Sequence, residues 1–302
     1  MTAPTSPSTP ATFDALSFLR ADELAPELLH ATFTRAFADY LIGPFQIPVA
    51  QWPMFLARQG VDLALSRVAM DAAGAPLAFA FVAPRPLPRR WRLATMGATP
   101  EARGSGAAPA LLDDLIARAA AASQHAVELE VFAQNERARR LYEGRGFRKI
   151  HDLLGYVADA GTIAPSAPGA GIGIGTGIGE SAPRSVDMPQ LLSWLEAAEH
   201  RIADLPLQVT ATVIRHGVDY HGWQTADAQV VFSLPDETVM IHSLIAPRDT
   251  DARALIRALV AVYPERRLRV PQLQREDLGG AALRALGAVP QPLHQQLMLR
   301  PL

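Results

Sequence analysis

Cysteine is absent from the 302 residues of this chain. Its absence excludes disulfide bonds, cysteine nucleophiles and thiolate metal sites. It is also compatible with a reducing compartment, and we expect the protein to be cytoplasmic. The eight histidines are scattered and form neither an HExxH pair nor another ligand spacing, so we expect no metal site.

Lysine and long apolar runs are scarce as well. Lys149 is the single lysine among 28 basic residues, and the net charge is −2. Because no long basic block is present, we expect no nucleic-acid partner. No apolar run approaches the roughly 18 residues of a membrane span, and the N-terminal MTAPTSPSTPAT lacks the basic and hydrophobic regions of a secretory signal. We therefore expect no membrane partner, and we expect residues 1–11 to form a disordered tail.

The chain does contain a globular balance of residues, 49% hydrophobic and 19% charged, and it is long enough for two domains. In the first half, hydrophobic periodicity predicts strands over residues 13–20, 63–70, 77–84, 91–98, 126–132 and 147–157. It predicts helices over residues 24–40, 51–60, 107–122 and 138–144. The strand–helix–strand order across 91–132 implies a parallel crossover inside a mostly antiparallel sheet.

The second half repeats this order in outline. The pattern predicts helices over residues 188–202, 251–263 and 281–287, and strands over 210–216, 228–234, 238–247, 267–273 and 294–301. Two tandem copies of one α+β (mixed α/β) fold are therefore the simplest interpretation. Residues 159–185 are rich in glycine, proline and alanine and are predicted to be a linker or an edge strand. Their GAGIGIGTGIG repeat also imitates a nucleotide-binding loop, which stays open as a weaker alternative.

The stretch TPEARGSGAAPALLDDL, residues 99–115, joins a predicted strand to a predicted helix. The first N–H groups of a helix have no partner within the helix, and they point outward with the positive end of its dipole. The glycines and alanines of residues 103–108 leave this backbone accessible, so a phosphate fits there. Arg103 would add a charge-assisted contact. An ordinary turn before a helix is the alternative.

A second motif, LEVFAQNERARRLYEGRGF, follows at residues 129–147. Together the two motifs resemble the GCN5-related N-acetyltransferase (GNAT) superfamily. The family pattern Arg/Gln-x-x-Gly-x-Gly/Ala is matched by Arg103, Gly106 and Ala108. The downstream pattern is matched by Asn135, Ala138, Leu141, Tyr142, Gly146 and Phe147. The resemblance covers residues 12–158, and the upstream stretch also resembles bacterial members that carry two such domains.

The resemblance implies a GNAT acyl-CoA N-acyltransferase fold with a parallel splayed pair of strands, and a catalytic domain at residues 12–158. It implies acetyl-CoA as the acyl-donor substrate and no metal. The residues expected to bind the donor are Met96, Gly97, Ala98, Arg103, Gly104, Ser105, Gly106, Ala107, Ala108, Asn135, Arg139 and Tyr142. A backbone N–H near Ala98 would polarise the thioester carbonyl, and Gly97 would suit a bulged strand end that faces the ligand.

The resemblance also implies acetyl transfer to a primary amine of a small molecule or peptide by direct attack. Tyr142 stands where the family places a general acid for the departing thiolate, and packing against Phe147 is its structural alternative. Glu130 is the candidate base for the acceptor amine, with a solvated or ion-paired carboxylate as the alternative. Glu128 shares its face of the strand and is a weaker candidate.

Residues 186–302 are predicted to be a degenerate GNAT-like domain without a donor site. The glycine loop is shortened there, and Asp249 and Asp251 stand where phosphates would bind, so the carboxylates would repel them. Gln274 and Leu283 stand about where the first half has its asparagine and tyrosine. We therefore expect one coenzyme per chain.

The role of this second half stays open between three interpretations: it completes the acceptor cleft, it forms the interface of a homodimer, or it only stabilises the first half. The alternative function is a non-catalytic acyl-CoA-binding or regulatory module, with the second half as its interaction surface.

Overall fold

The computed structural model describes residues 16–164 and 182–302. Within it the chain forms two compact units. Unit 1 comprises Met1–Leu56, Val61–Val127 and Pro301–Leu302, and unit 2 comprises Ala57–Gly60 and Glu128–Arg300. The catalytic domain predicted at residues 12–158 has residues in both units, and its boundaries stay a prediction. The GAGIGIGTGIG repeat and the N-terminal tail lie outside the described residues.

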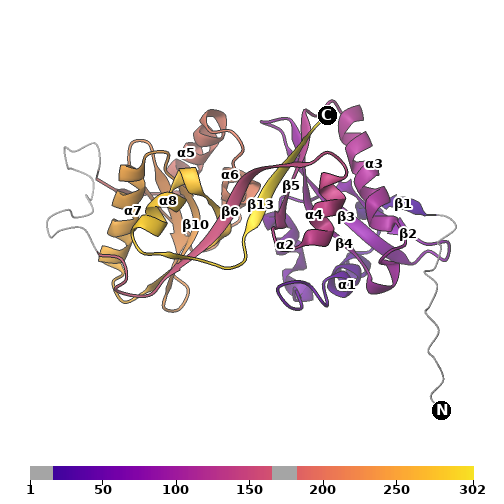
Figure 1. Ribbon diagram of the computed structural model, residues 1–302, viewed down its shortest axis with the longest axis horizontal. Helices are drawn as coiled ribbons and strands as arrows, with labels where there is room; N and C mark the ends of the chain where they lie inside the picture. The colour runs from indigo at the N-terminus through magenta and orange to yellow at the C-terminus, as the bar shows by residue number, and fades with distance from the viewer. Residues whose placement is uncertain (1–15, 165–181) are drawn as a thin grey trace, which may run out of the picture. The chain divides into compact units, whose positions relative to one another are not determined.

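Unit 1 contains an antiparallel sheet with the strand order β1-β2-β3-β4. Its strands are β1 (Ser17–Arg20), β2 (Asp62–Met70), β3 (Pro76–Arg85) and β4 (Arg90–Ala98), and β5 (Ala126–Phe132) begins in this unit. Its helices are η1 (Ala21–Glu23), α1 (Pro26–Ala36), η2 (Val49–Gln51), α2 (Trp52–Arg58), η3 (Pro100–Ala102) and α3 (Ala107–Ala121). Figure 1 shows α1 and α3 on either side of β3 and β4. These elements agree with the periodicity of the first half.

Aromatic side chains form the core between α1, α2 and the sheet. Phe33 of α1 is fully buried, and its ring centroid lies 5.0 Å from that of Trp52 and 5.9 Å from that of Phe79. The same cluster includes Phe37, Phe45 and Phe55. Aromatic pairs at these distances add to the free energy gained by burying their surface. Most of the aromatic residues between α1 and α2 therefore hold unit 1 together.

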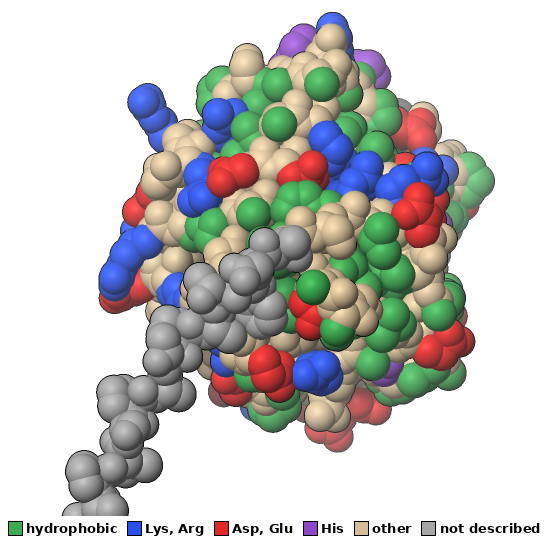
Figure 2. Space-filling model, turned by 90° about the vertical axis from the view of Figure 1, so that its right-hand side faces the viewer, with side chains coloured by type: hydrophobic (Ala, Val, Ile, Leu, Met, Phe, Trp, Pro, Cys, Tyr) green, Lys and Arg blue, Asp and Glu red, His purple; other side chains and the backbone are tan. Residues whose placement is uncertain are grey.

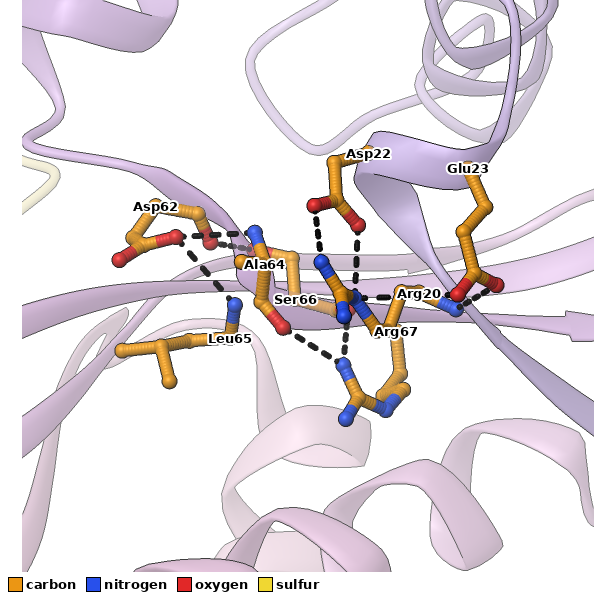
Figure 3. Close-up of polar contacts among 8 residues, drawn as sticks. All are labelled: Arg20, Asp22, Glu23, Asp62, Ala64, Leu65, Ser66 and Arg67. Atoms are coloured by element: carbon orange, nitrogen blue, oxygen red, sulfur yellow. Dashed lines mark hydrogen bonds and ion pairs between the residues drawn. The ribbon is translucent and has the colours of Figure 1, made fainter.

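Strand β2 carries a four-residue excursion between Asp62 and Arg67, where the pairing with β3 jumps from Val82 to Ala80. Figure 3 shows how local side chains hold it: an Asp62 Oδ1 accepts hydrogen bonds from the N–H groups of Ala64 and Leu65. The buried Ser66 hydroxyl donates to the Asp62 carbonyl at 2.7 Å and accepts from the Val82 N–H at 3.0 Å. The Ser66 hydroxyl therefore bridges β2 and β3 where their backbone pairing is interrupted.

A single-residue bulge follows in β4. Phe81 pairs with Thr95 and Val82 pairs with Leu93, so Ala94 has no opposite residue. Such bulges bend a strand and increase its twist. This distortion lies four residues before the end of the strand that leads to the glycine loop.

Unit 2 contains a mixed sheet with the strand order β5-β13-β6-β11-β10-β9-β8-β7. The strands that follow β5 are β6 (Arg148–Ala158), β7 (Arg184–Val186), β8 (His221–Gln224), β9 (Gln229–Ser233), β10 (Thr238–Ile245), β11 (Arg267–Arg275), β12 (Val289–Pro290) and β13 (Gln295–Pro301). The helices are α4 (Glu136–Glu143), α5 (Met188–Arg201), η4 (Leu207–Val209), α6 (Ala211–Ile214), α7 (Asp249–Val262), η5 (Glu276–Leu278) and α8 (Gly280–Ala285). Strands β10 and β11 are parallel, and α7 connects them.

Strand β6 has second-half partners along both edges. Its first residues pair with β13, and its last residues pair with β11 and β12. Figure 1 shows β13, the yellow C-terminal strand, beside β6. The backbone bond from Ala133 N–H to the His294 carbonyl, 2.9 Å long, places the start of β13 next to the end of β5. The last strand of the second half therefore occupies the position between two strands of the first half.

One strand predicted in the second half is wrong. Residues 210–216 contain the short helix α6, which η4 precedes, and the strand β8 was not predicted. The edge strand β7 begins within residues 159–185, which were predicted as a linker or an edge strand. Thr, Val and Ile favour strands, but Ala211 and Ile214 are spaced three apart and both are buried in the core beside α5. The Thr210 hydroxyl donates to the Leu207 carbonyl at 2.7 Å and tightens the preceding turn. Local packing therefore outweighs strand propensity.

On the face drawn in Figure 2, acidic and basic side chains lie among hydrophobic ones and adjoin each other in several places. In the described part of the chain, no helix is both long enough and apolar enough to span a membrane.

Candidate active site

The glycine loop lies in unit 1, between the end of β4 and the start of α3. Gly104 has a φ of +85° and Gly106, which precedes the first residue of α3, has a φ of +88°. Residues with side chains rarely adopt this left-handed conformation. A Cβ added to either glycine would meet no atom within 4 Å. The backbone here is therefore shaped by glycine and open on its outer side.

Three N–H groups of this loop are not used in the hydrogen bonds of the described chain. The Ser105 hydroxyl donates to the Ala102 carbonyl at 2.6 Å and accepts from the Ala107 N–H at 3.2 Å. The first bond of the helix runs from Ala110 to Gly106, and Pro109 has no N–H. Among the described residues, the N–H groups of Gly104, Gly106 and Ala108 have no partner. Three donors at the positive end of a 15-residue helix form a cradle for an anion.

Arg103 is held by a carboxylate rather than projecting free from the loop. Its Nη1 and Nη2 each donate to one oxygen of Asp39 at 2.5 Å, and Nη2 also approaches the carbonyl of Ala36 at 3.4 Å. The pairing lowers the pKa of Asp39 and raises that of Arg103. The phosphate contact predicted for Arg103 therefore requires the guanidinium to change or share its partner.

The end of β4 places backbone rather than side chains at the loop. Thr99 donates its N–H to Leu77 of β3 at 2.9 Å. Because such bonds alternate along an antiparallel ladder, the N–H groups of Met96 and Ala98 point away from β3. An N–H of this orientation is what the predicted oxyanion role of Ala98 requires.

Gly97 is explained by packing. A Cβ at this position would lie 3.0 Å from the Cβ of Ala36 and 3.1 Å from the ring of Phe79. The sequence predicts a bulged strand end facing the ligand at this glycine, whereas the bulge lies at Ala94 and the glycine leaves room for the ring of Phe79.

The acid and base candidates lie in unit 2. Glu128 is fully buried on β5 and Glu130 is partly buried, while Leu129 and Val131 are buried on the opposite face. Since both faces of this strand are covered, Glu130 is not a freely solvated carboxylate.

Asn135 begins α4, and its Oδ1 accepts a hydrogen bond from the Ala138 N–H at 3.2 Å. This is the bond of a helix N-cap, and it fixes the orientation of the amide. Arg139, four residues later, donates to the Ala133 carbonyl at 3.2 Å and to Glu143 at 3.1 Å. Both side chains therefore hold the start of α4, and their predicted contacts with the donor stay predictions.

Tyr142 lies in the last turn of α4 and is 8% exposed. Its ring centroid lies 5.8 Å from that of Phe147, whose N–H donates to the Tyr142 carbonyl at 3.2 Å. The structural interpretation of this tyrosine, packing against Phe147, is therefore confirmed. A buried phenol held in one orientation is equally what a proton donor needs, so the two roles are compatible.

The structure thus gathers the predicted residues into two groups. Met96 to Ala98 and Arg103 to Ala108 belong to unit 1, and Glu130, Asn135, Arg139 and Tyr142 belong to unit 2. Among the described residues, no cluster of three histidine or acidic side chains is arranged to hold a metal ion.

Sequence comparison identifies the family of the first half. Residues 27–147 match the model of the Acetyltransferase (GNAT) family. These residues form a GNAT-family domain. No curated protein of characterised function matches it in sequence.

Solved structures show that the GNAT fold extends over almost the whole chain. A GCN5-related N-acetyltransferase from Anabaena variabilis aligns with a TM-score of 0.64 at 12% identity, covering 95% of this chain and 72% of that one. The corresponding protein from Kribbella flavida aligns with a TM-score of 0.62 at 15% identity, covering 96% and 72%. That from Sphaerobacter thermophilus aligns at 0.57 and 13%, covering 95% and 96%. The predicted mixed α/β GNAT fold is confirmed, and at these identities the similarity speaks of fold alone.

In the second half, helix α7 replaces the glycine loop directly after β10. Asp249 is its first residue and pairs with Arg253 at 2.5 Å, while Asp251 is buried and pairs with Arg248 at 2.6 Å. Both carboxylates are therefore part of the helix start. This arrangement favours the predicted loss of a donor site in this half.

A polar cluster on the bulge of β10 was not predicted from the sequence. His242 has no opposite residue in β9, its Nε2 lies 2.7 Å from the Ser233 hydroxyl, and its ring stacks on Tyr220 with centroids 4.1 Å apart. The Tyr220 hydroxyl lies 3.2 Å from Nδ1. Burial, together with the charge of Arg58, lowers the pKa of His242 to about 4. A histidine inside the strand predicted at residues 238–247 was the only signal for this cluster.

This low pKa predicts a loss of stability in acid. Between pH 6.5 and about 4 the unfolded chain binds a proton at His242 that the folded chain does not, so stability falls as the pH falls through that window. We expect wild type to lose up to about 3 kcal/mol more than His242→Gln over this range. Urea unfolding at stepped pH measures the difference. Parallel pH profiles for the two proteins would contradict the prediction.

Proposed function

We propose that this protein transfers the acetyl group of acetyl-CoA to a primary amine of a small molecule or peptide. The observation that carries the proposal is the loop of unit 1, where three N–H groups without partners among the described residues stand at the start of α3. Such a cradle suits the diphosphate of coenzyme A. Membership of the GNAT family supports the reaction class.

In the proposed reaction the amine nitrogen attacks the thioester carbonyl carbon, and the carbon–sulfur bond breaks. The N–H of Ala98 stabilises the negative charge that collects on the carbonyl oxygen. Tyr142 donates a proton to the departing thiolate, and Glu130, or a water relayed by it, accepts the proton of the amine. Transfer is direct, since the chain has no cysteine to form a thioester intermediate.

The second half is proposed to complete the acceptor cleft or to form the interface of a homodimer, and the compartment proposed for the protein is the cytoplasm. Because Asp249 and Asp251 occupy the start of α7, we propose one coenzyme site per chain.

The test is a screen of amine acceptors with the purified protein, read as release of the coenzyme A thiol. We expect thiol release that depends on both the amine and the protein, and a calorimetric stoichiometry near one acetyl-CoA per chain. Binding of acetyl-CoA without thiol release for any amine would instead favour the non-catalytic acyl-CoA-binding module. A stoichiometry near two would show that the second half binds a donor as well.

A further inference from the structure

Two ion pairs fasten the end of α1 to the donor loop. Arg35 of α1 pairs with Glu101 of the loop at 2.9 Å, and Arg103 of the loop pairs with Asp39, just beyond α1, at 2.5 Å. The two ion pairs have opposite polarity: the α1 side supplies one basic and one acidic residue, and so does the loop. All four residues belong to unit 1. We call this arrangement the α1 clasp.

Within the α1 clasp, the Arg103 guanidinium is bonded to groups at the end of α1 and not to the glycine loop. Both terminal nitrogens of its guanidinium face Asp39, and Nη2 also faces the carbonyl of Ala36, the last residue of α1. A cation at the C-terminus of a helix is favourable because the last carbonyls carry partial negative charge. The positive charge next to the three N–H donors is therefore neutralised by Asp39.

We propose that Asp39 is a resident counter-ion that the diphosphate of the donor displaces from Arg103, so that binding of the donor releases the α1 clasp at one of its two ion pairs. The proposal rests on the proposed use of coenzyme A. It assigns Asp39 the role of setting donor affinity, and it links the donor loop to the connection between α1 and α2.

Charge and exposure favour the exchange. The side chain of Asp39 is 62% exposed and that of Arg103 is 30% exposed, so water screens their attraction. An exposed pair of this kind contributes little to stability, so a stronger anion can displace it. A diphosphate bound at Gly104, Gly106 and Ala108 carries more negative charge than one carboxylate. The residues that would bind it follow Arg103 directly in the sequence.

The backbone beyond Asp39 would respond to the exchange. Turn bonds run from Tyr40 N–H to the Phe37 carbonyl at 3.4 Å and from Gly43 N–H to the Tyr40 carbonyl at 2.9 Å. A third bond, 3.1 Å long, joins Phe45 N–H to Phe37. Once Arg103 leaves, Asp39 no longer fastens this turn to the loop, and its N–H groups should exchange with solvent faster.

The test compares Asp39→Asn with Glu101→Gln by calorimetric titration with coenzyme A. The two carboxylates have nearly the same exposure, 62% and 63%, but Glu101 makes its ion pair with Arg35 and acts on Arg103 only through the longer-range attraction of its charge. We expect Asp39→Asn to bind coenzyme A about two- to fivefold more tightly than wild type, since the competing ion pair is gone. Glu101→Gln, which removes the same charge but breaks no bond to Arg103, should change the affinity by less than about twofold.

Hydrogen exchange supplies a second readout. Coenzyme A should accelerate exchange at residues 37–45 in wild type, and in Asp39→Asn exchange there should be fast before coenzyme A is added. Equal or weaker binding by Asp39→Asn, or slower exchange of wild type with coenzyme A, would overturn the role of Asp39 alone. Failure of wild type to bind coenzyme A would instead refute the proposed function.

Discussion

A fragment that ends at residue 164 should be insoluble, although it contains every motif of the GNAT resemblance. It retains β6 but loses the partners of both its edges, because β11, β12 and β13 all lie in the second half. The fragment would present unpaired strand edges and would expose Leu153 and Tyr156, which are fully buried in the whole chain. Unpaired edges of this kind promote aggregation. Expression of the fragment followed by size-exclusion chromatography measures the outcome.

Co-expression of residues 1–172 with residues 173–302 is the matched control. Both cut ends fall between Ala158 and Arg184, where no strand of the described chain is interrupted. Because the second fragment restores all partners of β6, the pair should co-purify as a soluble complex. A soluble 1–164 fragment that unfolds cooperatively would show that the first half folds without the second.

Replacing Tyr142 by Phe should lower the turnover number by about 10²- to 10⁴-fold, the range over which general acids act. The Kd for acetyl-CoA should stay unchanged, because the variant ring still fills the space beside Phe147. Only the phenolic O–H is lost, and with it the proton for the departing thiolate. The amine-dependent rate of thiol release and calorimetric binding of acetyl-CoA are the two measurements.

Tyr156→Phe is the matched control for this variant. Tyr156 is also buried, and its hydroxyl donates to Glu276 at 3.0 Å within the core of unit 2. Its loss should lower stability by only about 1 kcal/mol, because Glu276 is 46% exposed and keeps its ion pair with Arg284 at 3.1 Å, and it should leave the turnover number unchanged. If Tyr142→Phe turns over at the wild-type rate, Tyr142 is not the acid and its role is packing alone.

The order of helices and strands in the first half could be predicted because its signals are local. Alternating apolar residues mark β2, β3 and β4, and glycine or proline residues stand at their ends. The helix α3 begins at the residue where the glycine loop ends, as predicted. The short helix α6 could not be predicted, because burial against α5 decides its conformation and strand propensity does not.

Contacts between residues that are far apart in the chain could not be predicted from the sequence. Asp39 and Arg103 are 64 residues apart, and nothing around Asp39 marks it as the partner of an arginine. The position of β13 between β5 and β6 depends on pairing between chain segments more than 130 residues apart, for which no local pattern exists. Gly97 illustrates a third limit: a glycine required by a ring packed against it cannot be distinguished in sequence from a glycine that admits a ligand.

The strand distortion next to the glycine loop is present in both halves, at Ala94 in β4 and at His242 in β10. The second half therefore has a bulged strand in the corresponding place, and Asp249 and Asp251 rather than a glycine loop begin the helix α7 that follows it. For protein engineering, this narrows the task of building another coenzyme pocket on the same scaffold. The natural starting point is to transplant the short segment that carries Gly104 and Gly106 to the start of α7, since the bulged strand β10 already precedes that helix.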